Sequence, residues 1–438
     1  MKHTHEFRDP VHTFINVRSD ERAVIDSRAF QRLRHVHQLA LTYLVYPGAT
    51  HRRFEHSLGV MELATRIFDV VTDATNVLHP SVREIIPDAD ALRYWRSVLR
   101  MAALCHDMGH LPFSHAAEDL LLPPGFSHET LSVSIICSPA MEQLWLAMTP
   151  PLRSSDIVKL AVGKKKAPRE LKFSIWETIL SEIIVGDSFG ADRMDYLLRD
   201  SYHAGVQYGR FDHNRLINTL RILPQLDKDT VEPALGLDAG GLESSEALIL
   251  ARHFIFSQVY YHHIRRIYDL HLIDFLAEWL PSGKFPVVLD EFLSISDSEV
   301  IAAIRREATG AASKLREFAT RIENRKHFKR LYSLSSEDKT GGILNPGKVI
   351  FDLAKDKFGA DNVKHDFIPA KIVAPDFPVL YYDDEIHSSL KVSRILPAIP
   401  TIEVDRVYCN RSIVDEAIRW RKEIKVQALN LSTQGKLL

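Results

Sequence analysis

Through most of the first 275 residues, apolar side chains recur every three or four positions, which is the spacing of one buried helix face. The stretch from Thr50 to Thr72 has this spacing at Leu58, Met61, Ala64, Ile67, Phe68 and Val71. A second stretch, from Tyr94 to Met108, has it at Val98, Met101, Ala102 and Cys105. We therefore expect residues 20–275 to be mainly helical.

Glycine, proline and capping residues divide this helical region. Pro112 interrupts the pattern, and Ser114 is a candidate cap for a new helix over SHAAEDLL (114–121). A helix over residues 191–205 follows Gly190 and ends at Gly205, whereas Ser244 to Trp279 has few breakers and predicts a long helical stretch. The basic segment VGKKKAPRE (162–170) predicts a solvated loop.

The pattern pauses at Pro281–Val288, and helices are expected again near Asp297 and over Leu315–Leu331, followed by a linker at 339–347. Beyond the linker, short β-branched and aromatic runs predict strands at 367–374, 377–382, 389–396 and 401–409, with a final helix near Ser412. The fold class expected is mainly α, with a helical body and a small C-terminal α/β lobe. The expected domains are residues 1–275, a helical extension over 276–345, and the lobe over 346–438.

Composition limits the classes of function. The 438 residues carry 55 Lys and Arg against 57 Asp and Glu, so there is no global basic field and nucleic acid is not indicated as a partner. The three cysteines lie far apart, which fits a reducing cytoplasm. Because there is no apolar leader and no apolar run of about 18 residues, neither secretion nor membrane insertion is expected.

Histidine is the unusual feature of the composition. Twelve of the 21 histidines fall between His3 and His128. Histidine is the commonest metal ligand and a proton donor near neutrality, but buried or exposed histidines without such roles would give the same count. The histidine content is therefore compatible with two interpretations: a metal site, or histidines that have no catalytic or metal-binding role.

The densest chemical signal is LCHDMGHLPFSH, from Leu104 to His115. Adjacent side chains diverge by about 100° on a helix, so His106 and Asp107 can hold one cation only with ligands from other helices. His56 is a candidate third ligand and Asp192 a fourth. The alternative for the stripe Asp192, Arg193, Tyr196 and Asp200 is a solvated helix face with local ion pairs.

The ordered set of His56, His106, Asp107 and Asp192 resembles the metal ligands of the HD-domain phosphohydrolases. The match is closer to the deoxynucleoside triphosphate triphosphohydrolases, both bacterial and of the SAM-and-HD-domain type. It extends over six segments within roughly the first 270 residues: FRDPVH (7–12), FQRLRHVHQLA (30–40), YPGATHRRFEHSLGV (46–60), CHDMGHLPFSH (105–115), ADRMDYLLRDSYHAG (191–205) and VYYHH (259–263). Since no SAM domain is expected before them, the resemblance is to the catalytic body only.

The resemblance implies a catalytic site for a divalent metal (Mn²⁺, Fe²⁺, Mg²⁺ or Zn²⁺) held by the four ligands. It implies hydrolysis of a deoxynucleoside triphosphate to the deoxynucleoside and intact inorganic triphosphate. His115 is then the general acid, supported by Glu118 and His128. Glu118 stands where the SAM-and-HD-domain enzyme has aspartate, so its relay geometry differs.

The resemblance also implies the substrate contacts. Arg53, His110, Arg193 and Arg252 match positions that contact triphosphate, and Arg193 replaces a lysine of the SAM-and-HD-domain enzyme. Gln38, Leu39, Asp200 and Tyr260 match positions around the sugar, and Tyr196 is a further substrate-binding candidate that also suits a core tyrosine. A solvated arginine is the alternative for Arg252.

A second nucleotide site is implied at Asp26, Gln31 and Arg34, which match the positions that read an activating guanine nucleotide. The activator would be GTP, dGTP or a dNTP; an amphipathic helix packing on its neighbour explains the same residues. Kinship further implies a cytoplasmic homo-oligomer, a tetramer or a hexamer. Two other functions stay open: an HD phosphohydrolase for ribonucleotides, modified nucleotides or phosphodiesters, and a nucleotide- or single-stranded nucleic-acid-binding scaffold.

Overall fold

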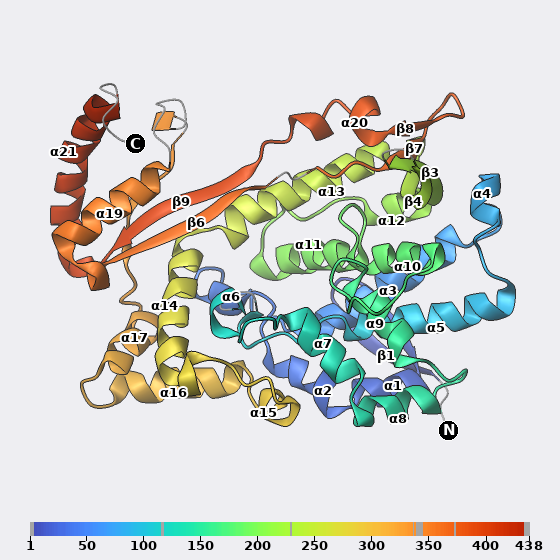
Figure 1. Cartoon of the computed structure of the whole chain (residues 1–438), viewed down its shortest axis with the longest axis horizontal. Helices are drawn as coiled ribbons and strands as arrows, with labels where there is room; N and C mark the ends of the chain where they lie inside the picture. Colours follow the sequence, from blue (N-terminus) through green and yellow to red (C-terminus); the bar gives the residue numbers. More distant parts are fainter. Residues whose placement is uncertain are drawn as a thin grey trace. The chain divides into compact units, whose positions relative to one another are not determined.

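The computed structural model describes residues 4–114, 118–227, 230–335, 337–338, 345–371 and 374–432. By their internal contacts the residues form two compact units, which are described separately (Figure 1). The first comprises residues 1–255, 285–299 and 373–400, and the second comprises 256–284, 300–372 and 401–438. The mainly helical class with small sheets is confirmed, whereas the division at residues 275 and 345 stays a prediction.

Five helices build the centre of the first unit: α3 (Arg53–Val71), α5 (Ala89–Cys105), α9 (Ser154–Val162), α10 (Ile175–Val185) and α11 (Ala191–Ala204). α3 packs against α5, α10 and α11, and α9 packs against α5 and α10. The apolar stripes expected on α3 and α5 are buried, with no member more than 3% exposed. α11 ends where expected, because Gly205 adopts the left-handed backbone (φ 71°) that closes a helix.

Further helices complete this unit. They are α1 (Ser19–Ile25), α2 (Arg28–Gln31), η1 (Arg32–His35), η2 (Ala40–Leu44), α4 (Pro80–Arg83), α6 (Glu118–Leu121), α7 (His128–Ile136), α8 (Pro139–Ala147), α12 (His213–Thr219), η4 (Ala239–Gly241), α13 (Leu242–Ile255), α15 (Leu289–Leu293), α20 (Ser389–Val392) and η8 (Leu396–Ala398). The cap expected of Ser114 concerns residues 115–117, which lie outside the described residues.

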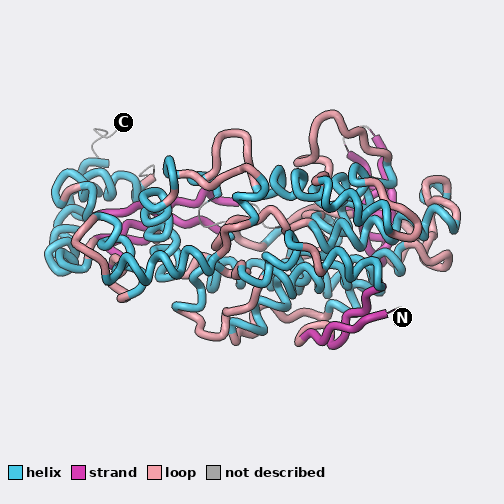
Figure 2. The backbone as a smooth tube through the Cα atoms, turned by 90° about the horizontal axis from the view of Figure 1, so that it is seen from below, coloured by secondary structure: helices cyan, strands magenta, loops and turns pink. Residues whose placement is uncertain are grey.

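Two small sheets also belong to the first unit. An antiparallel hairpin at the start of the described chain pairs β1 (Thr4–Asp9) with β2 (Thr13–Arg18), as Figure 2 shows beside the N-terminal label. The other sheet has the order β3 (Leu220–Asp227), β4 (Thr230–Asp238), β7 (Pro378–Leu380) and β8 (Ile386–Ser388). β4 and β7 run parallel, and the other pairs are antiparallel.

The strands β3 and β4 correct the expectation of helix across residues 220–238. Leu220 and Ile222 of β3 are buried and lie opposite Leu237 and Leu235 of β4, which are buried as well. The strand expected at 389–396 is also wrong, because Ser389–Val392 form a helical turn after β8. There the Ser389 hydroxyl accepts a hydrogen bond from the backbone N–H of Phe377 (3.2 Å).

The second unit combines helices with one antiparallel sheet of order β5 (Lys329–Ser333), β9 (Ile402–Cys409) and β6 (Val363–Lys371). Its helices are η5 (Phe256–Tyr260), α14 (His263–Trp279), η6 (Pro281–Gly283), α16 (Asp297–Thr309, whose first three residues belong to the first unit), α17 (Lys314–Glu323), α19 (Pro346–Phe358), η7 (Ala360–Asn362), η9 (Arg411–Ile413) and α21 (Val414–Ser432). Leu331, Val363, Val407 and Trp420 are members of its core.

Two helical expectations in this part of the chain need correction. The stretch Ser244–Trp279 is interrupted by the π-helical turn η5, so α13 and α14 are separate helices. The helix expected over Leu315–Leu331 ends at Glu323, because Lys329–Ser333 pair with β9. The strands at 367–371, 378–380 and 402–409 and the final helix are confirmed.

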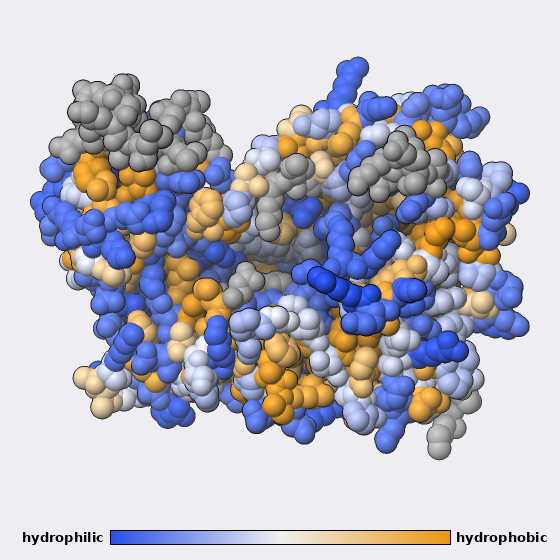
Figure 3. Space-filling model, viewed as in Figure 1, coloured by the Kyte–Doolittle hydropathy of each residue, from blue (hydrophilic) through white to orange (hydrophobic). Residues whose placement is uncertain are grey.

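On the face shown in Figure 3, hydrophilic and hydrophobic residues are interspersed. Within the part of the chain that the structure describes, no helix combines the length and the apolar character that a membrane span requires.

Buried His327 gives the second unit an expected pH dependence. Burial and the charges of Lys329, His271 and Arg325 lower the pKa of His327 from 6.5 to about 4. Between these values the unfolded chain binds a proton that the folded chain does not, so lowering the pH favours unfolding. We expect the free energy of unfolding to fall below pH 6.5, with this group adding at most about 1.4 kcal/mol per pH unit. Denaturant unfolding of the wild type and of His327→Gln at several pH values tests this, and identical slopes would contradict it.

Candidate active site

Three packed helices bring the four predicted metal ligands together. His56 lies in the second turn of α3, His106 and Asp107 follow the last residue of α5, and Asp192 lies in the first turn of α11. The start of α3 is fixed by Glu55, whose carboxylate accepts a hydrogen bond from the backbone N–H of Arg52 (2.7 Å). The positions of the ligands are therefore set by where these helices begin and end.

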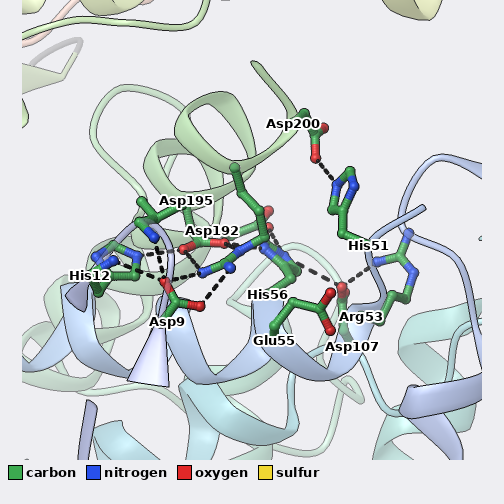
Figure 4. Close-up of polar contacts among 12 residues, drawn as sticks. Asp9, His12, His51, Arg53, Glu55, His56, Asp107, Asp192, Asp195 and Asp200 are labelled. Atoms are coloured by element: carbon green, nitrogen blue, oxygen red, sulfur yellow. Dashed lines mark hydrogen bonds and ion pairs between the residues drawn. The ribbon is translucent and has the colours of Figure 1, made fainter. Parts of the chain in front are cut away.

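The four side chains lie close together, and His56, Asp107 and Asp192 of this group are labelled in Figure 4. His56 Nε2 lies 3.0 Å from an Asp192 oxygen and 3.6 Å from an Asp107 oxygen. His106 Nε2 lies 3.3 Å from Asp107 and 3.5 Å from Asp192. The side chains of His56, His106 and Asp107 are at most 8% exposed, whereas Asp192 is 34% exposed and marks the open side of the cluster.

The hydrogen bonds behind the cluster indicate that both histidines present lone pairs to it. His56 Nδ1 donates to Asp195 (2.7 Å), and His106 Nδ1 donates to the carbonyl oxygen of Ala103 (2.7 Å). With the protons held on Nδ1, each Nε2 faces the carboxylates, and His106 Nε2 is buried without a hydrogen-bond partner in the described structure. Ligand atoms of His56, His106 and Asp107 lie within 4.8 Å of one another, with Asp192 beside them, and two imidazole nitrogens and two carboxylates in this arrangement fit a divalent cation.

The electrostatics of the cluster agree with a place for positive charge. Burial alone would lower the pKa of His56, but Asp192 and Asp195 raise it to about 10. Burial would raise the pKa of Asp107, but Arg53, His106 and His110 hold it well below its usual range. Arg53 also lies in this cluster: its guanidinium donates through Nη1 to Asp107 and through Nε to the Ser114 hydroxyl (2.9 Å).

Part of the predicted proton relay lies beside the cluster. His115 falls outside the described residues. Glu118 Oε1 accepts hydrogen bonds from both the backbone N–H and Nδ1 of His128 (2.7 Å each), so these two residues are paired. The His128 ring stacks on His110 with centroids 4.1 Å apart, and His110 Nε2 is 3.3 Å from Asp107. Burial, with the charges of Arg53 and His128, lowers the pKa of His110, which favours the neutral imidazole.

The other predicted triphosphate contacts form a second basic group. Burial and the charge of Arg193 lower the pKa of Arg252, while Tyr196 and Asp187 act in the opposite direction. Arg193 Nη2 lies 3.5 Å from Asp187, and its Nε and Nη1 are buried without hydrogen-bond partners in the described structure. Two guanidinium groups that repel each other, one with unused donors, suit a polyanion.

The basic segment 162–170 is an exposed turn beside these residues. Lys165 Nζ lies 3.1 Å from Asp187, and Lys166 Nζ lies 3.2 Å from Glu129. Their side chains are 86% and 59% exposed, which fits the solvated loop that the sequence predicts.

Among the predicted sugar contacts, Asp200 has a partner that sequence analysis missed. Its Oδ1 lies 2.7 Å from Nε2 of His51, both side chains are buried, and they point toward each other in Figure 4. The backbone N–H of Gln38 donates to the carbonyl oxygen of His51 (3.0 Å), and Gln38 and Leu39 are buried. Tyr260 lies in the second unit, at the end of η5.

Of the predicted activator residues, Asp26 directly follows α1, Gln31 ends α2 and Arg34 lies in η1. Asp26 is exposed and pairs with Arg22 (3.3 Å), and Gln31 Nε2 donates to the carbonyl oxygen of Ile25 (2.8 Å). Arg34 donates to Gln31 Oε1 (2.9 Å) and stacks over the ring of Phe54, 3.5 Å from its centroid. Two of the three residues are thus in direct contact, and their nucleotide role stays a prediction.

Behind His56 lies a buried charged network that sequence analysis missed. Asp195 accepts from His56, from His12 Nε2 (2.6 Å) and from Arg199 Nε (2.8 Å), and Arg199 also donates to Asp9 (2.7 Å). The available signal was the spacing on α11, because Asp195 lies three residues after Asp192 and four before Arg199. The network orients His56, and it gives His12 a partner.

Comparison with protein families finds two matches in the chain. The model of the HD domain matches residues 53–148, which include His56, His106 and Asp107. The model of the HD associated region matches residues 211–349.

Similar proteins extend over more of the chain. An uncharacterized protein of Methanocaldococcus jannaschii is 36% identical over 60% of this chain, which spans about half (47%) of that relative's length. The deoxynucleoside triphosphate triphosphohydrolase SAMHD1 of Gallus gallus is 28% identical over 92% of this chain and 72% of its own length. A crystal structure of a hypothetical protein from Aquifex aeolicus superposes with a TM-score of 0.76 at 31% identity, over 95% of this chain and 99% of that one.

Proposed function

Because the chain belongs to the HD-domain phosphohydrolase family, we propose that it hydrolyses deoxynucleoside triphosphates to the deoxynucleoside and inorganic triphosphate. The observation that carries this proposal is the pairing of two features in one unit. One is the cluster of His56, His106, Asp107 and Asp192, which suits a divalent cation. The other is the basic group of Arg193 and Arg252, whose mutual repulsion a triphosphate would relieve.

The four ligands would hold a divalent cation, which supplies Lewis acidity and lowers the pKa of bound water. Arg53, Arg193 and Arg252 bind and orient the phosphates. The neutral imidazole of His110, which lies beside Asp107, forms a hydrogen bond with a phosphate group. Glu118 fixes the ring orientation of His128, and His115 donates a proton to the leaving 5′-oxygen of the deoxynucleoside.

Product analysis tests the proposal. The protein is incubated with each dNTP and each NTP in Mn²⁺ or Mg²⁺, with and without GTP or dGTP, and the products are separated by chromatography. Deoxynucleoside and inorganic triphosphate in equal amounts are expected from dNTPs. Monophosphate with pyrophosphate or orthophosphate, or turnover of ribonucleotides alone, would contradict the proposal and assign the site to another phosphohydrolase reaction.

Recognition of the sugar is proposed to depend on Asp200, held by His51. A buried carboxylate suits the 3′-hydroxyl, and the 2.7 Å contact with His51 Nε2 fixes its direction. We expect His51→Gln to raise the KM for a dNTP about tenfold, as for the loss of one oriented hydrogen bond, with a smaller change in kcat. A variant of exposed Tyr382 (Tyr382→Phe) serves as the control. An unchanged KM in His51→Gln would contradict this role.

Activation and assembly are further parts of the proposal. Asp26, Gln31 and Arg34 would bind a guanine nucleotide or a dNTP, and the chain would act as a homo-oligomer. The test is size-exclusion chromatography with light scattering, together with the hydrolysis rate, at increasing GTP. We expect a tetramer or hexamer and a rate that rises with GTP in the wild type but not in Arg34→Ala. A rate independent of every nucleotide added would contradict activation.

A further inference from the structure

Asp297, at the start of α16, is a buried carboxylate that ties two loops of the first unit together. Its side chain is 1% exposed, and both of its oxygens accept hydrogen bonds. Oδ2 accepts from the backbone N–H (2.9 Å) and from Nδ1 (2.5 Å) of His37, and Oδ1 accepts from the backbone N–H of Phe113 (2.8 Å). Phe113 lies 184 residues away in the sequence, so this is a tertiary anchor rather than a local cap.

The loop that Asp297 holds has an unfavourable backbone conformation. Phe113 and Ser114 both have φ of 58°, in the left-handed region that residues with a side chain rarely adopt. Such strain persists only where the surroundings impose it. Here the Phe113 N–H is bound by Asp297, and the Ser114 hydroxyl donates to the carbonyl oxygen of His37 (3.0 Å), so each loop fixes the other.

Both loops lead directly to the candidate active site. His37 precedes Gln38 and Leu39, the predicted sugar contacts. The Ser114 hydroxyl accepts from Arg53 Nε (2.9 Å), and Arg53 in turn binds Asp107. A series of hydrogen-bonded residues therefore runs from Asp297 through His37 and Ser114 to Arg53.

A second contact fixes the same stretch of chain. Buried Arg32 donates through Nε to the carbonyl oxygen of Ile295 (2.9 Å) and through Nη1 to that of His110 (2.9 Å). Its guanidinium also lies over the ring of Phe292, 4.4 Å from the centroid. The chain just before Asp297 is thus attached to another predicted phosphate contact, His110.

We propose that Asp297 is a positioning residue for hydrolysis: it imposes the strained backbone at Phe113 and Ser114, and thereby directs Arg53 and the Gln38 loop at the substrate. The identity of the substrate in this inference rests on the proposed function. The positioning of Arg53 by Asp297 does not depend on it. Among the described residues Asp297 makes no direct contact with the four predicted metal ligands, so we expect its loss to leave metal binding intact.

The test compares Asp297→Ala and Asp297→Asn with Glu299→Ala. Glu299 caps the same helix through Ser296 (2.7 and 2.6 Å) and makes no hydrogen bond to either loop within the described residues, so its loss perturbs the start of α16 without removing a hydrogen bond to His37 or Phe113. We expect Asp297→Ala to lower kcat/KM for the best dNTP about 100-fold, as for a displacement of about 1 Å, with metal content unchanged. Asp297→Asn keeps an acceptor for the Phe113 N–H, so its kcat/KM should fall only about tenfold. This variant replaces Asp297→Ala in the comparison if the alanine variant does not fold. The kcat/KM of Glu299→Ala should stay within threefold of the wild-type value.

A double variant separates positioning from general destabilisation. If Asp297 acts through Ser114, the double variant Asp297→Ala/Ser114→Ala should be no less active than the less active of the two single variants. Fully additive losses, or an equal loss in Glu299→Ala, would overturn the proposal.

If the wild type hydrolyses no dNTP, the proposed function fails, and the role of Asp297 is judged by calorimetric titration of inorganic triphosphate. Affinity about tenfold weaker in Asp297→Asn than in Glu299→Ala would still support positioning. Equal affinities would overturn it.

Discussion

Replacing His106 with alanine is expected to abolish both metal binding and hydrolysis, lowering the turnover rate at least about 1000-fold. His106 Nε2 is buried and without a hydrogen-bond partner in the described structure, between two ionised carboxylates. The variant removes this lone pair without leaving a buried charge unpaired, so the fold should survive. An Asp107 variant would be less informative, because Asp107 also neutralises buried Arg53.

Two measurements check this expectation. Elemental analysis after dialysis against Mn²⁺ gives the metal content per chain, and chromatography gives the turnover of a dNTP. His79→Ala is the matched control, since His79 caps the short helix α4 through Ser81 and takes no part in the cluster. Hydrolysis at the wild-type rate by metal-free His106→Ala would show that the cluster is not the site of the reaction.

The sequence predicted the helices whose buried face repeats without interruption. The stripes from Leu58 to Val71 and from Val98 to Cys105 became α3 and α5, and Gly190 and Gly205 bound α11. The candidate ligands could be proposed from the sequence because each lies at the start or the end of one of these helices, in an order that resembles that of a known family. Where apolar residues alternate at period two within a helical region, as at Leu220 and Ile222, the strand depends on a partner strand and was missed.

The rest of the site depends on contacts between distant parts of the chain. His12, His37 and His51 have no local sequence signal, yet each meets a buried aspartate: Asp195, Asp297 and Asp200, respectively. These pairs join residues 183, 260 and 149 positions apart, and only the packing of the helices brings them together. Local patterning therefore identified ligands but not the carboxylates that orient histidines around them.

Asp195→Ala is expected to destabilise the protein by about 3–5 kcal/mol, the cost of removing one partner from a buried ion pair. Asp195 and Arg199 both have side chains that are 0% exposed. The variant leaves Arg199 with Asp9 as its remaining carboxylate and removes the acceptors of His12 Nε2 and His56 Nδ1. Because His56 loses the bond that holds its proton on Nδ1, metal affinity should also fall about 10- to 100-fold.

Denaturant unfolding and a metal titration on the same variants distinguish the two effects. The matched control is Asp69→Ala, which breaks the pair with Arg96 (2.6 Å) on side chains that are 49% and 39% exposed. Because water screens that pair, its loss should cost at most about 1 kcal/mol and leave metal affinity unchanged. Equal destabilisation by both variants would mean that burial adds nothing to the Asp195 network. Wild-type metal affinity in Asp195→Ala would mean that His56 keeps its orientation through packing alone, since no other acceptor within the described structure reaches its Nδ1.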